Sequence, residues 1–198
     1  MSKKDGAVDP IIREDLNQII DSLGEVFDVL AGQTTLVTGA NGFLASYLVD
    51  TVLSLNKTIL SEKPARVIAL TRRPIEQNNR LIQHIGNPNL VFLKGDVAQS
   101  FEIPAGIDYI IHAASLASPN DYFIRPIDTI NANTLGTKTL LDYAVKNSLK
   151  GFLFVSSAEV YGNPDIHHIP IKEDYFGNVN PIGPRSVYQE AKRFGETL

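Results

Sequence analysis

Residues 34–45 read Thr-Thr-Leu-Val-Thr-Gly-Ala-Asn-Gly-Phe-Leu-Ala, and this segment carries the clearest indication of the fold. Thr34–Thr38 is a short run rich in β-branched residues, which is typical of a buried strand. Gly39 and Gly42 then predict a tight turn, and residues 44–55 have the apolar pattern of a helix. A strand, a glycine turn and a helix start point backbone N–H groups and the positive end of the helix dipole at an anion such as a phosphate.

Strands and helices alternate along most of the chain around this turn. We expect further strands at residues 66–70, 90–93, 108–111 and 152–155, helices at 10–30, 127–147 and from 186 onward, and a long loop at 162–184. Asp9 and Pro10 are suited to begin the first helix, and Gly32 is suited to end it. Short apolar strands separated by helices are typical of parallel βαβ units. The sequence therefore predicts an α/β fold with a doubly wound parallel (Rossmann) sheet in residues 34–198, after a helical extension in residues 1–33.

Composition excludes several classes of function. The 198 residues, 43% hydrophobic and 20% charged, suit one globular domain, and the net charge of −4 gives no basic excess for nucleic-acid binding. The sequence has no cysteine, which excludes disulfides, thiolate zinc sites and cysteine nucleophiles. No apolar run approaches the roughly 18 residues of a membrane span, and residues 1–9 lack the apolar region of a signal peptide. We expect a cytoplasmic protein without nucleic-acid or membrane partners.

The histidines suggest no metal site. His167 and His168 lie in the long loop and have no third ligand nearby in the sequence, so we expect no metal there. We expect His84 at the surface and His112 to pack in the fold rather than to act as a catalyst.

The glycine turn has the spacing G-x-x-G-x-x-A, which suits the pyrophosphate of a dinucleotide. Gly39 allows the tight turn, Gly42 lets the backbone approach the pyrophosphate, and the small Ala45 lets the helix pack close to the strand. A glycine turn alone is weak evidence, but its place after the first strand of a βαβ unit favours a dinucleotide. We expect NAD or NADP to contact this turn and the ends of the next three strands, at Gly39, Asn41, Gly42, Phe43, Leu44, Arg72, Asp96, Val97, Ala113 and Ala114.

The end of the second predicted strand bears on the choice of cofactor. Arg72 and Arg73 stand where a carboxylate would select the free ribose hydroxyl of NAD, and arginine there suits the 2′-phosphate of NADP. NADP is therefore slightly favoured, although the two arginines also suit a solvated loop, and Arg72 also suits stacking on adenine with NAD bound. Asp96 suits a hydrogen bond from the adenine amino group, or the cap of a turn.

Tyr188 and Lys192 are four residues apart, so they share one face of the last predicted helix. A tyrosine of ordinary pKa is a poor base at neutral pH, and we expect a nearby ammonium and a positive nicotinamide ring to lower the pKa of Tyr188. Ser156 and Ser157 end the fifth predicted strand, at the sheet edge where such folds bind ligands. The glycine turn, a serine and a tyrosine–lysine pair thus occur in order on suitable elements.

Residues 34–198 resemble the extended short-chain dehydrogenase/reductases, and within them the nucleotide-sugar epimerases, dehydratases and decarboxylases. The matching segments are residues 38–43, Gly95-Asp96, His112-Ala113-Ala114, Asn133 with Gly136-Thr137, residues 156–162 and residues 188–192. The resemblance implies that Ser157, rather than Ser156, acts with Tyr188 and Lys192 in catalysis. It also implies that Asn133 supports the cofactor and the active site, and that Tyr188 and Lys192 contact the cofactor.

The family mechanism implied by the resemblance oxidises a sugar hydroxyl, typically at C4. Tyr188 would act as base, Ser157 would stabilise the oxygen, Lys192 would tune Tyr188, and the 4-keto sugar would then epimerise, lose water or lose carboxylate. Dehydratases of the dTDP-glucose type carry an Asp-Glu pair where this chain has Ala158-Glu159, which counts against that subtype. We rank a decarboxylase or an epimerase first, with Glu159 as a further catalytic residue. The alternatives are a catalytically silent NADP sensor or scaffold, and a simple carbonyl reductase.

The end of the chain affects how much of such an enzyme this sequence contains. The chain stops six residues after Lys192, whereas the substrate lobe of the family follows the tyrosine–lysine helix. We therefore expect residues 34–198 to be an incomplete Rossmann domain from a longer protein. The resemblance further implies a UDP-, GDP- or dTDP-sugar substrate and a homodimer.

Overall fold

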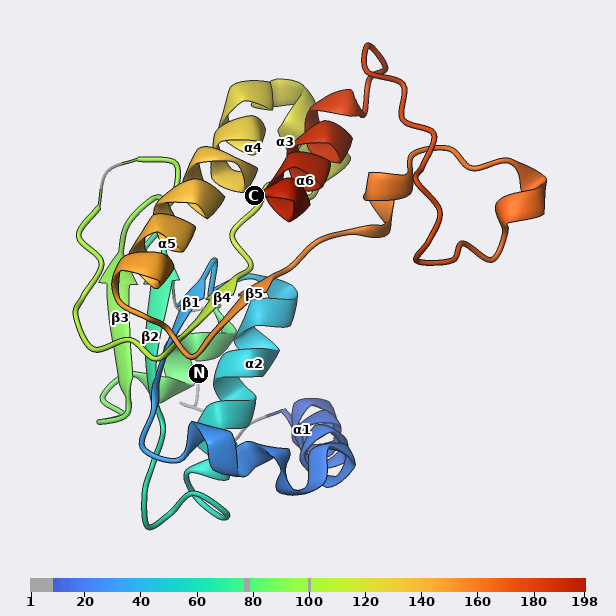
Figure 1. Cartoon of the computed structure of the whole chain (residues 1–198). Helices are drawn as coiled ribbons and strands as arrows, with labels where there is room; N and C mark the ends of the chain where they lie inside the picture. The colour runs from blue at the N-terminus through green and yellow to red at the C-terminus, as the bar shows by residue number, and fades with distance from the viewer. Residues whose placement is uncertain (1–8, 77–78, 100) are drawn as a thin grey trace, which may run out of the picture.

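The structure is a computed structural model, which describes residues 9–76, 79–99 and 101–198 (Figure 1). Five parallel strands form one sheet in the order β3-β2-β1-β4-β5. Their bounds are β1 Thr34–Thr38, β2 Arg66–Thr71, β3 Leu90–Lys94, β4 Tyr109–His112 and β5 Gly151–Phe154. The chain runs outward from β1 to β3 and then returns to place β4 on the other side of β1, which makes β1–β4 the topological switch point. The doubly wound parallel fold is therefore confirmed.

Apolar side chains alternate between the two faces of the sheet, so both faces bury a core. On one face, Val37 and Val67 pack with Val49 of α2 (Phe43–Leu55). On the other, Leu36 and Ile68 lie in a second cluster that includes residues of α4 (Pro126–Asn133) and α5 (Leu135–Lys146). Helices thus cover the sheet from both sides (Figure 1), as continuous apolar strands require.

The prediction of one helix over residues 127–147 is wrong. The structure divides this segment into α4 and α5, and the short helix α3 (Pro119–Ile124) precedes them. The break falls at Thr134, whose φ of −111° and ψ of −71° depart from helical values. The Thr134 hydroxyl donates to the Ile130 carbonyl at 2.8 Å, and such a hydroxyl bond to the preceding turn commonly bends helices.

The prediction of one helix over residues 10–30 is also wrong in its second half. Helix α1 (Pro10–Leu23) ends at Gly24, which has φ +55°, and residues 24–30 form the 3-10 helix η1. The helix start is confirmed, because the Asp9 side chain accepts a hydrogen bond from the Ile11 N–H at 2.9 Å. Residues 1–8 of the predicted extension lie outside the described residues. A left-handed glycine stops the α-helix before the hydrophobic pattern ends.

A buried ionic cluster joins α1, α2 and the 3-10 helix η2 (Arg80–His84). Asp50 is almost fully buried and pairs with Arg80 and with His84, whose Nε2 lies 2.5 Å from an Asp50 oxygen. The Arg80 guanidinium stacks over the Tyr47 ring, and the Tyr47 hydroxyl donates to Asp15 of α1 at 2.5 Å. The expectation that His84 lies at the surface is wrong, since its side chain is only 11% exposed.

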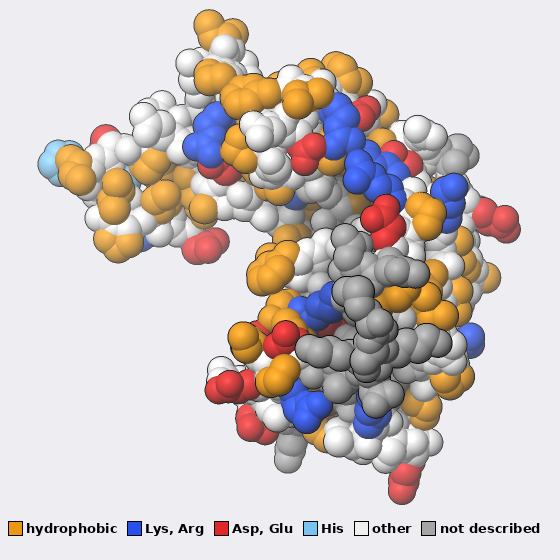
Figure 2. Space-filling view, turned by 180° about the vertical axis from the view of Figure 1, so that it is seen from behind, with side chains coloured by type: hydrophobic (Ala, Val, Ile, Leu, Met, Phe, Trp, Pro, Cys, Tyr) orange, Lys and Arg blue, Asp and Glu red, His pale blue; other side chains and the backbone are white. Residues whose placement is uncertain are grey.

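Residues 162–184 form the predicted long loop, which projects from the body as an arm (Figures 1 and 2). Its regular structure is the single turn η4 (Ile166–His168) and a bridge between Gly162 and Asn178. The arm leads from the short 3-10 helix η3 (Ala158–Tyr161) into α6 (Ser186–Thr197), so the predicted start of the last helix is confirmed.

Two kinds of feature are absent from residues 9–76, 79–99 and 101–198, which the structure describes. No helix there is long and apolar enough to cross a membrane. No group of three or more His, Cys, Asp or Glu side chains is gathered there as a metal ion would require.

Candidate active site

The glycine turn after β1 is held close to the loop that follows β4. Gly39 has φ +64°, and a Cβ placed on it would lie 2.8 Å from the Cα of Ala114. The Gly42 N–H donates to the Gly39 carbonyl at 2.8 Å, and Gly42 is also the N-cap of α2. No side chain caps this end of α2, so its first N–H groups are available to an anion.

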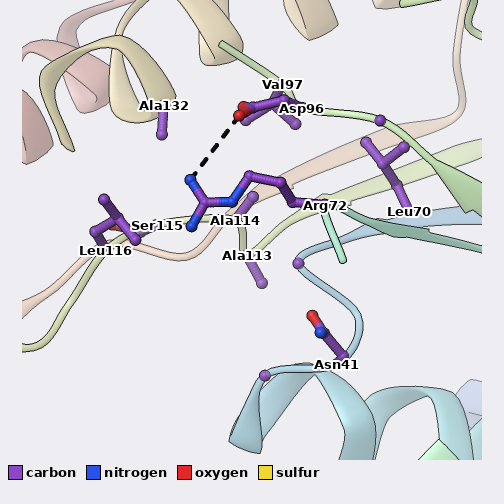
Figure 3. Close-up of a pocket in the computed structure, with 13 residues that line it drawn as sticks. Asn41, Leu70, Arg72, Asp96, Val97, Ala113, Ala114, Ser115, Leu116 and Ala132 are labelled. Atoms are coloured by element: carbon purple, nitrogen blue, oxygen red, sulfur yellow. Dashed lines mark ion pairs between the residues drawn. The ribbon is translucent and has the colours of Figure 1, made fainter. Parts of the chain in front are cut away.

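A cavity of about 200 Å³ opens beside this turn at the carboxyl ends of β1 to β4 (Figure 3). Its walls come from the loops after four strands and from α4, so the topology brings together residues far apart in sequence. The lining residues are Gly39, Asn41, Gly42, Leu70, Arg72, Gly95, Asp96, Val97, Ala113, Ala114, Ser115, Leu116 and Ala132. Eight of the positions that the sequence predicted as cofactor contacts therefore meet at one cavity.

Some predicted contacts lie elsewhere, and some lining residues were missed. The side chains of Phe43 and Leu44 are 76% and 63% exposed at the start of α2 and do not line the cavity. Leu116 and Ala132 line it without having been predicted, although Ala132 directly precedes Asn133, which the resemblance singled out.

Arg72 and Asp96 both line the cavity and point toward each other, with an Arg72 nitrogen 3.9 Å from an Asp96 oxygen (Figure 3). The other Asp96 oxygen accepts the Ala98 N–H at 3.0 Å, so this carboxylate also caps its own turn. Both side chains are partly exposed, and such a pair is weak in water. Arg72 therefore remains available to a ligand.

His112 is buried and links three elements of the site. Its Nε2 lies 3.2 Å from the Ala132 carbonyl and its Nδ1 lies 2.8 Å from the Thr38 hydroxyl. The Thr38 oxygen in turn accepts the Ala114 N–H at 3.1 Å. Burial lowers the pKa of His112 to about 4, with a smaller contribution from Lys192, so the ring is neutral at pH 7. A neutral ring with its proton on Nε2 satisfies all three contacts, which is a packing role.

Asn133 is fully buried at the end of α4, beside the cavity. Its side-chain nitrogen donates to Ser115 at 3.0 Å and to the Thr129 carbonyl at 2.8 Å. Its side-chain oxygen has no hydrogen-bond partner among the described residues. An unpaired buried oxygen is costly, and so this atom is suited to accept a hydrogen bond from a bound molecule.

Tyr188 and Lys192 lie on one face of α6, as their spacing predicts, and both are buried. Lys192 Nζ donates to the Val155 carbonyl at 2.6 Å and lies 5.8 Å from the centre of the Tyr188 ring. Burial lowers the pKa of Lys192 to about 8. Burial raises the pKa of Tyr188, and Ser157 opposes that rise through a hydrogen bond. In the protein alone, therefore, the expected lowering of the Tyr188 pKa does not occur, because burial dominates.

Ser157 and Glu159 reach this face of α6 from η3, directly after β5. Ser157 is the N-cap of η3, and its hydroxyl accepts the Glu159 N–H at 3.3 Å. One Glu159 oxygen lies 2.9 Å from the Arg185 guanidinium and the other accepts Gln189 Nε2 at 2.8 Å. The Ser156 hydroxyl instead donates to Glu196 at 2.5 Å. The structure thus brings Ser157, Tyr188 and Glu159 to one place.

Known proteins resemble this chain over most of its length. A UDP-glucuronic acid decarboxylase 1 from Danio rerio is 37% identical over 164 residues, covering 82% of this chain and 36% of that protein. A UDP-glucuronic acid decarboxylase 3 from Arabidopsis thaliana is 40% identical over 163 residues, with coverage of 82% and 44%. The chain therefore spans less than half the length of these relatives.

A solved structure and a family profile agree with these relatives. A double mutant of a dTDP-glucose 4,6-dehydratase from Streptomyces venezuelae, solved with NAD bound, superposes with a TM-score of 0.61 at 26% identity. The match covers 82% of this chain and 49% of that one. Residues 35–198 match the profile of the NAD dependent epimerase/dehydratase family. Together with the fold and the glycine-turn cavity, these matches show that the chain belongs to the NAD-dependent epimerase/dehydratase family.

Proposed function

We propose that this chain forms the NAD(P)-binding and catalytic part of an enzyme that modifies a nucleotide sugar through a transient 4-keto sugar. The observation that carries the proposal is the meeting of Ser157, Tyr188 and Lys192 at the sheet edge that also holds the glycine-turn cavity. A tyrosine base, a hydroxyl donor and a lysine at such an edge suit reversible oxidation of an alcohol.

The residues of the cavity fit a dinucleotide. The absence of a Cβ at Gly39 and the uncapped start of α2 leave room and N–H donors for a pyrophosphate. The unpaired oxygen of Asn133 is a further acceptor beside the cavity. When bound, the nicotinamide supplies the acceptor for a hydride from the sugar carbon and the donor for its return.

In the proposed reaction, the Tyr188 oxygen takes the proton of the C4 hydroxyl, and Ser157 donates a hydrogen bond to the same oxygen as it becomes a carbonyl. Because burial raises the pKa of Tyr188, the phenolate needs a nearby positive charge. Lys192 is the cation next to its ring, and its pKa of about 8 leaves it mostly protonated at pH 7.

We propose that the reaction after oxidation is decarboxylation, with epimerisation as the alternative outcome. A carbonyl at C4 stabilises the negative charge that develops at C5 when a carboxylate leaves as carbon dioxide. Glu159 lies beside Tyr188 and is suited to handle a proton at the neighbouring position. Ala158 stands where the dTDP-glucose dehydratases carry an aspartate, so the acid for water loss is missing. The names of the two relatives support a UDP-linked glucuronate as substrate.

Arg72 bears on the choice between NAD and NADP. Its guanidinium lines the cavity and, with Arg73 next to it, supports a preference for the 2′-phosphate of NADP. The NAD bound in the Streptomyces dehydratase supports NAD instead. Titrating the purified protein with both cofactors separates the two, since a preference for NADP predicts the lower Kd for NADP.

The experiment for the function uses the full-length protein with NAD or NADP and a panel of UDP-, GDP- and dTDP-sugars. Mass spectrometry of the products is expected to show UDP-glucuronate losing carbon dioxide. Tyr188→Phe is expected to keep cofactor binding and to lose conversion by at least about a hundredfold. A parent protein that binds neither cofactor in a thermal-shift assay contradicts the proposal. We also propose a homodimer, from the resemblance, and a cytoplasmic location, from the composition of the sequence. Light scattering and cell fractionation test them.

A further inference from the structure

The ring of Tyr188 on α6 is covered by the ring of a second tyrosine. Tyr122 of α3 is 3% exposed, and its ring lies 5.5 Å from that of Tyr188, centre to centre, with 16° between the planes. This stacked pair joins a helix that follows β4 to the helix that carries the tyrosine–lysine pair. The second tyrosine therefore fixes the plane of the first and excludes water from one of its faces.

Arg185 connects the stacked pair to Glu159. It is the residue before α6, its Nε donates to the Tyr122 hydroxyl at 3.4 Å, and a terminal nitrogen lies 2.9 Å from Glu159. Gln189, one turn further on, donates to the second oxygen of the same carboxylate at 2.8 Å. One guanidinium thus contacts groups from α3 and η3 at once, which a planar, forked cation does better than an ammonium.

The charged groups around Tyr188 affect how readily its hydroxyl ionises and acts as a base. Glu159 and Tyr122 each act electrostatically to raise the pKa of Tyr188, in addition to burial, while Ser157 lowers it. Lys192, on the same helix, places its ammonium over the Tyr188 ring at 5.8 Å from the ring centre. Arg185 is paired with the one carboxylate in this set, so it offsets the charge that most opposes a phenolate at Tyr188.

We propose that Arg185, anchored by Tyr122, is a positioning residue that neutralises Glu159 and thereby keeps Tyr188 usable as a base. This inference rests on the proposed function. It adds two residues, Arg185 and Tyr122, to Ser157, Glu159, Tyr188 and Lys192.

The first test follows the ionisation of Tyr188 without relying on turnover. The full-length protein is labelled with ¹³C at the tyrosine Cζ, NAD is added, and the Tyr188 signal is assigned by its loss in Tyr188→Phe. Arg185→Met is expected to move the titration of Tyr188 to higher pH, because Glu159 is then uncompensated. Arg185→Lys retains a positive charge and is expected to titrate close to the parent.

Further variants separate the effect of the Arg185 charge on the Tyr188 titration from the effect of its packing. Glu159→Gln is expected to move the titration of Tyr188 to lower pH, and in the double variant with Arg185→Met the arginine substitution should have little further effect. Arg125→Met is the matched control, since it removes an arginine paired with a carboxylate, Asp121, on the neighbouring helix. It is expected to leave the titration unchanged.

The second test measures sugar oxidation against pH. Arg185→Met is expected to lower kcat about tenfold at pH 7 and to recover toward the parent rate at higher pH. Tyr122→Phe keeps the stack but loses the anchor, so a smaller change in the same direction is expected. A titration of Tyr188 that is the same in Arg185→Met and the parent overturns the inference, whether or not the protein is active. Parent protein that never oxidises a sugar, with the titration shifted as expected, overturns the proposed function instead.

Discussion

Gly39→Ala tests the link between the backbone of the turn and cofactor binding. The substitution has two separate costs: a side chain at φ +64°, and a Cβ only 2.8 Å from the Cα of Ala114. Gly106→Ala is a matched control, because Gly106 has φ +77° and no atom lies within 4 Å of its Cβ position. The control therefore carries the cost of the backbone conformation without the contact.

The magnitudes follow from these two costs. Left-handed backbone costs a residue with a Cβ about 1–2 kcal/mol, which lowers the Tm of a chain of this size by about 2–8 °C. Gly106→Ala is expected to show only this loss. Gly39→Ala is expected to lose more, because the backbone of Ala114 cannot move aside without displacing the β4 loop that lines the cavity. Differential scanning calorimetry measures both values.

Cofactor affinity separates the two variants more sharply. A shift of the turn moves the N–H groups that would face the pyrophosphate, so Gly39→Ala is expected to weaken NAD binding at least about tenfold, or about 1.4 kcal/mol. Gly106→Ala is expected to bind NAD like the parent. Isothermal titration calorimetry at one pH and one salt concentration makes the comparison. Equal affinity for NAD in Gly39→Ala and the parent would show that the turn backbone does not hold the pyrophosphate.

Three further outcomes are expected. Because the folded-state pKa of His112 is about 4, against 6.5 when unfolded, the unfolded chain takes up a proton first as pH falls. The free energy of unfolding should therefore drop by about 2 kcal/mol from pH 7 to pH 5, and urea titration should show a smaller drop for His112→Gln. Gly195→Ala places a Cβ in direct contact with the Phe154 ring and should destabilise the fold by about 1–3 kcal/mol. Thermal unfolding measures this loss, and an unchanged Tm would disprove the prediction. Arg72→Ala should weaken NADP binding at least about fivefold more than NAD binding, and an equal effect on the two Kd values would count against the proposed preference.

The alternation of apolar strands and helices was enough to predict the fold class, because that pattern depends on local composition. Breaks within helices were harder to foresee. Thr134 and Gly24 each end a helix in the middle of a continuing hydrophobic pattern. These breaks depend on the hydrogen bond that the Thr134 hydroxyl donates and on the left-handed backbone of Gly24. The spacing of hydrophobic residues indicates neither of them.

The candidate site was predictable where its residues follow strands directly, as at Gly39, Asp96 and Ala114. Parallel strands deliver such residues to one sheet edge, whatever the details of packing. The contact between Arg185 and Tyr122 was not predictable, since the two residues lie 63 positions apart and meet only through the packing of helices. The pKa of Tyr188 was expected to fall, but its burial could not be read from the spacing with Lys192.

We propose that this chain takes part in hydride transfer from a sugar carbon, and the transfer of an isotope label from that carbon shows whether it does. UDP-glucuronate carrying deuterium at C4 is mixed with an excess of the full-length protein and its bound NAD or NADP, quenched early and analysed by mass spectrometry. We expect deuterium in the nicotinamide cofactor with the parent protein and none with Tyr188→Phe. Parent protein that binds the cofactor and the sugar nucleotide but leaves all deuterium on the sugar would contradict it.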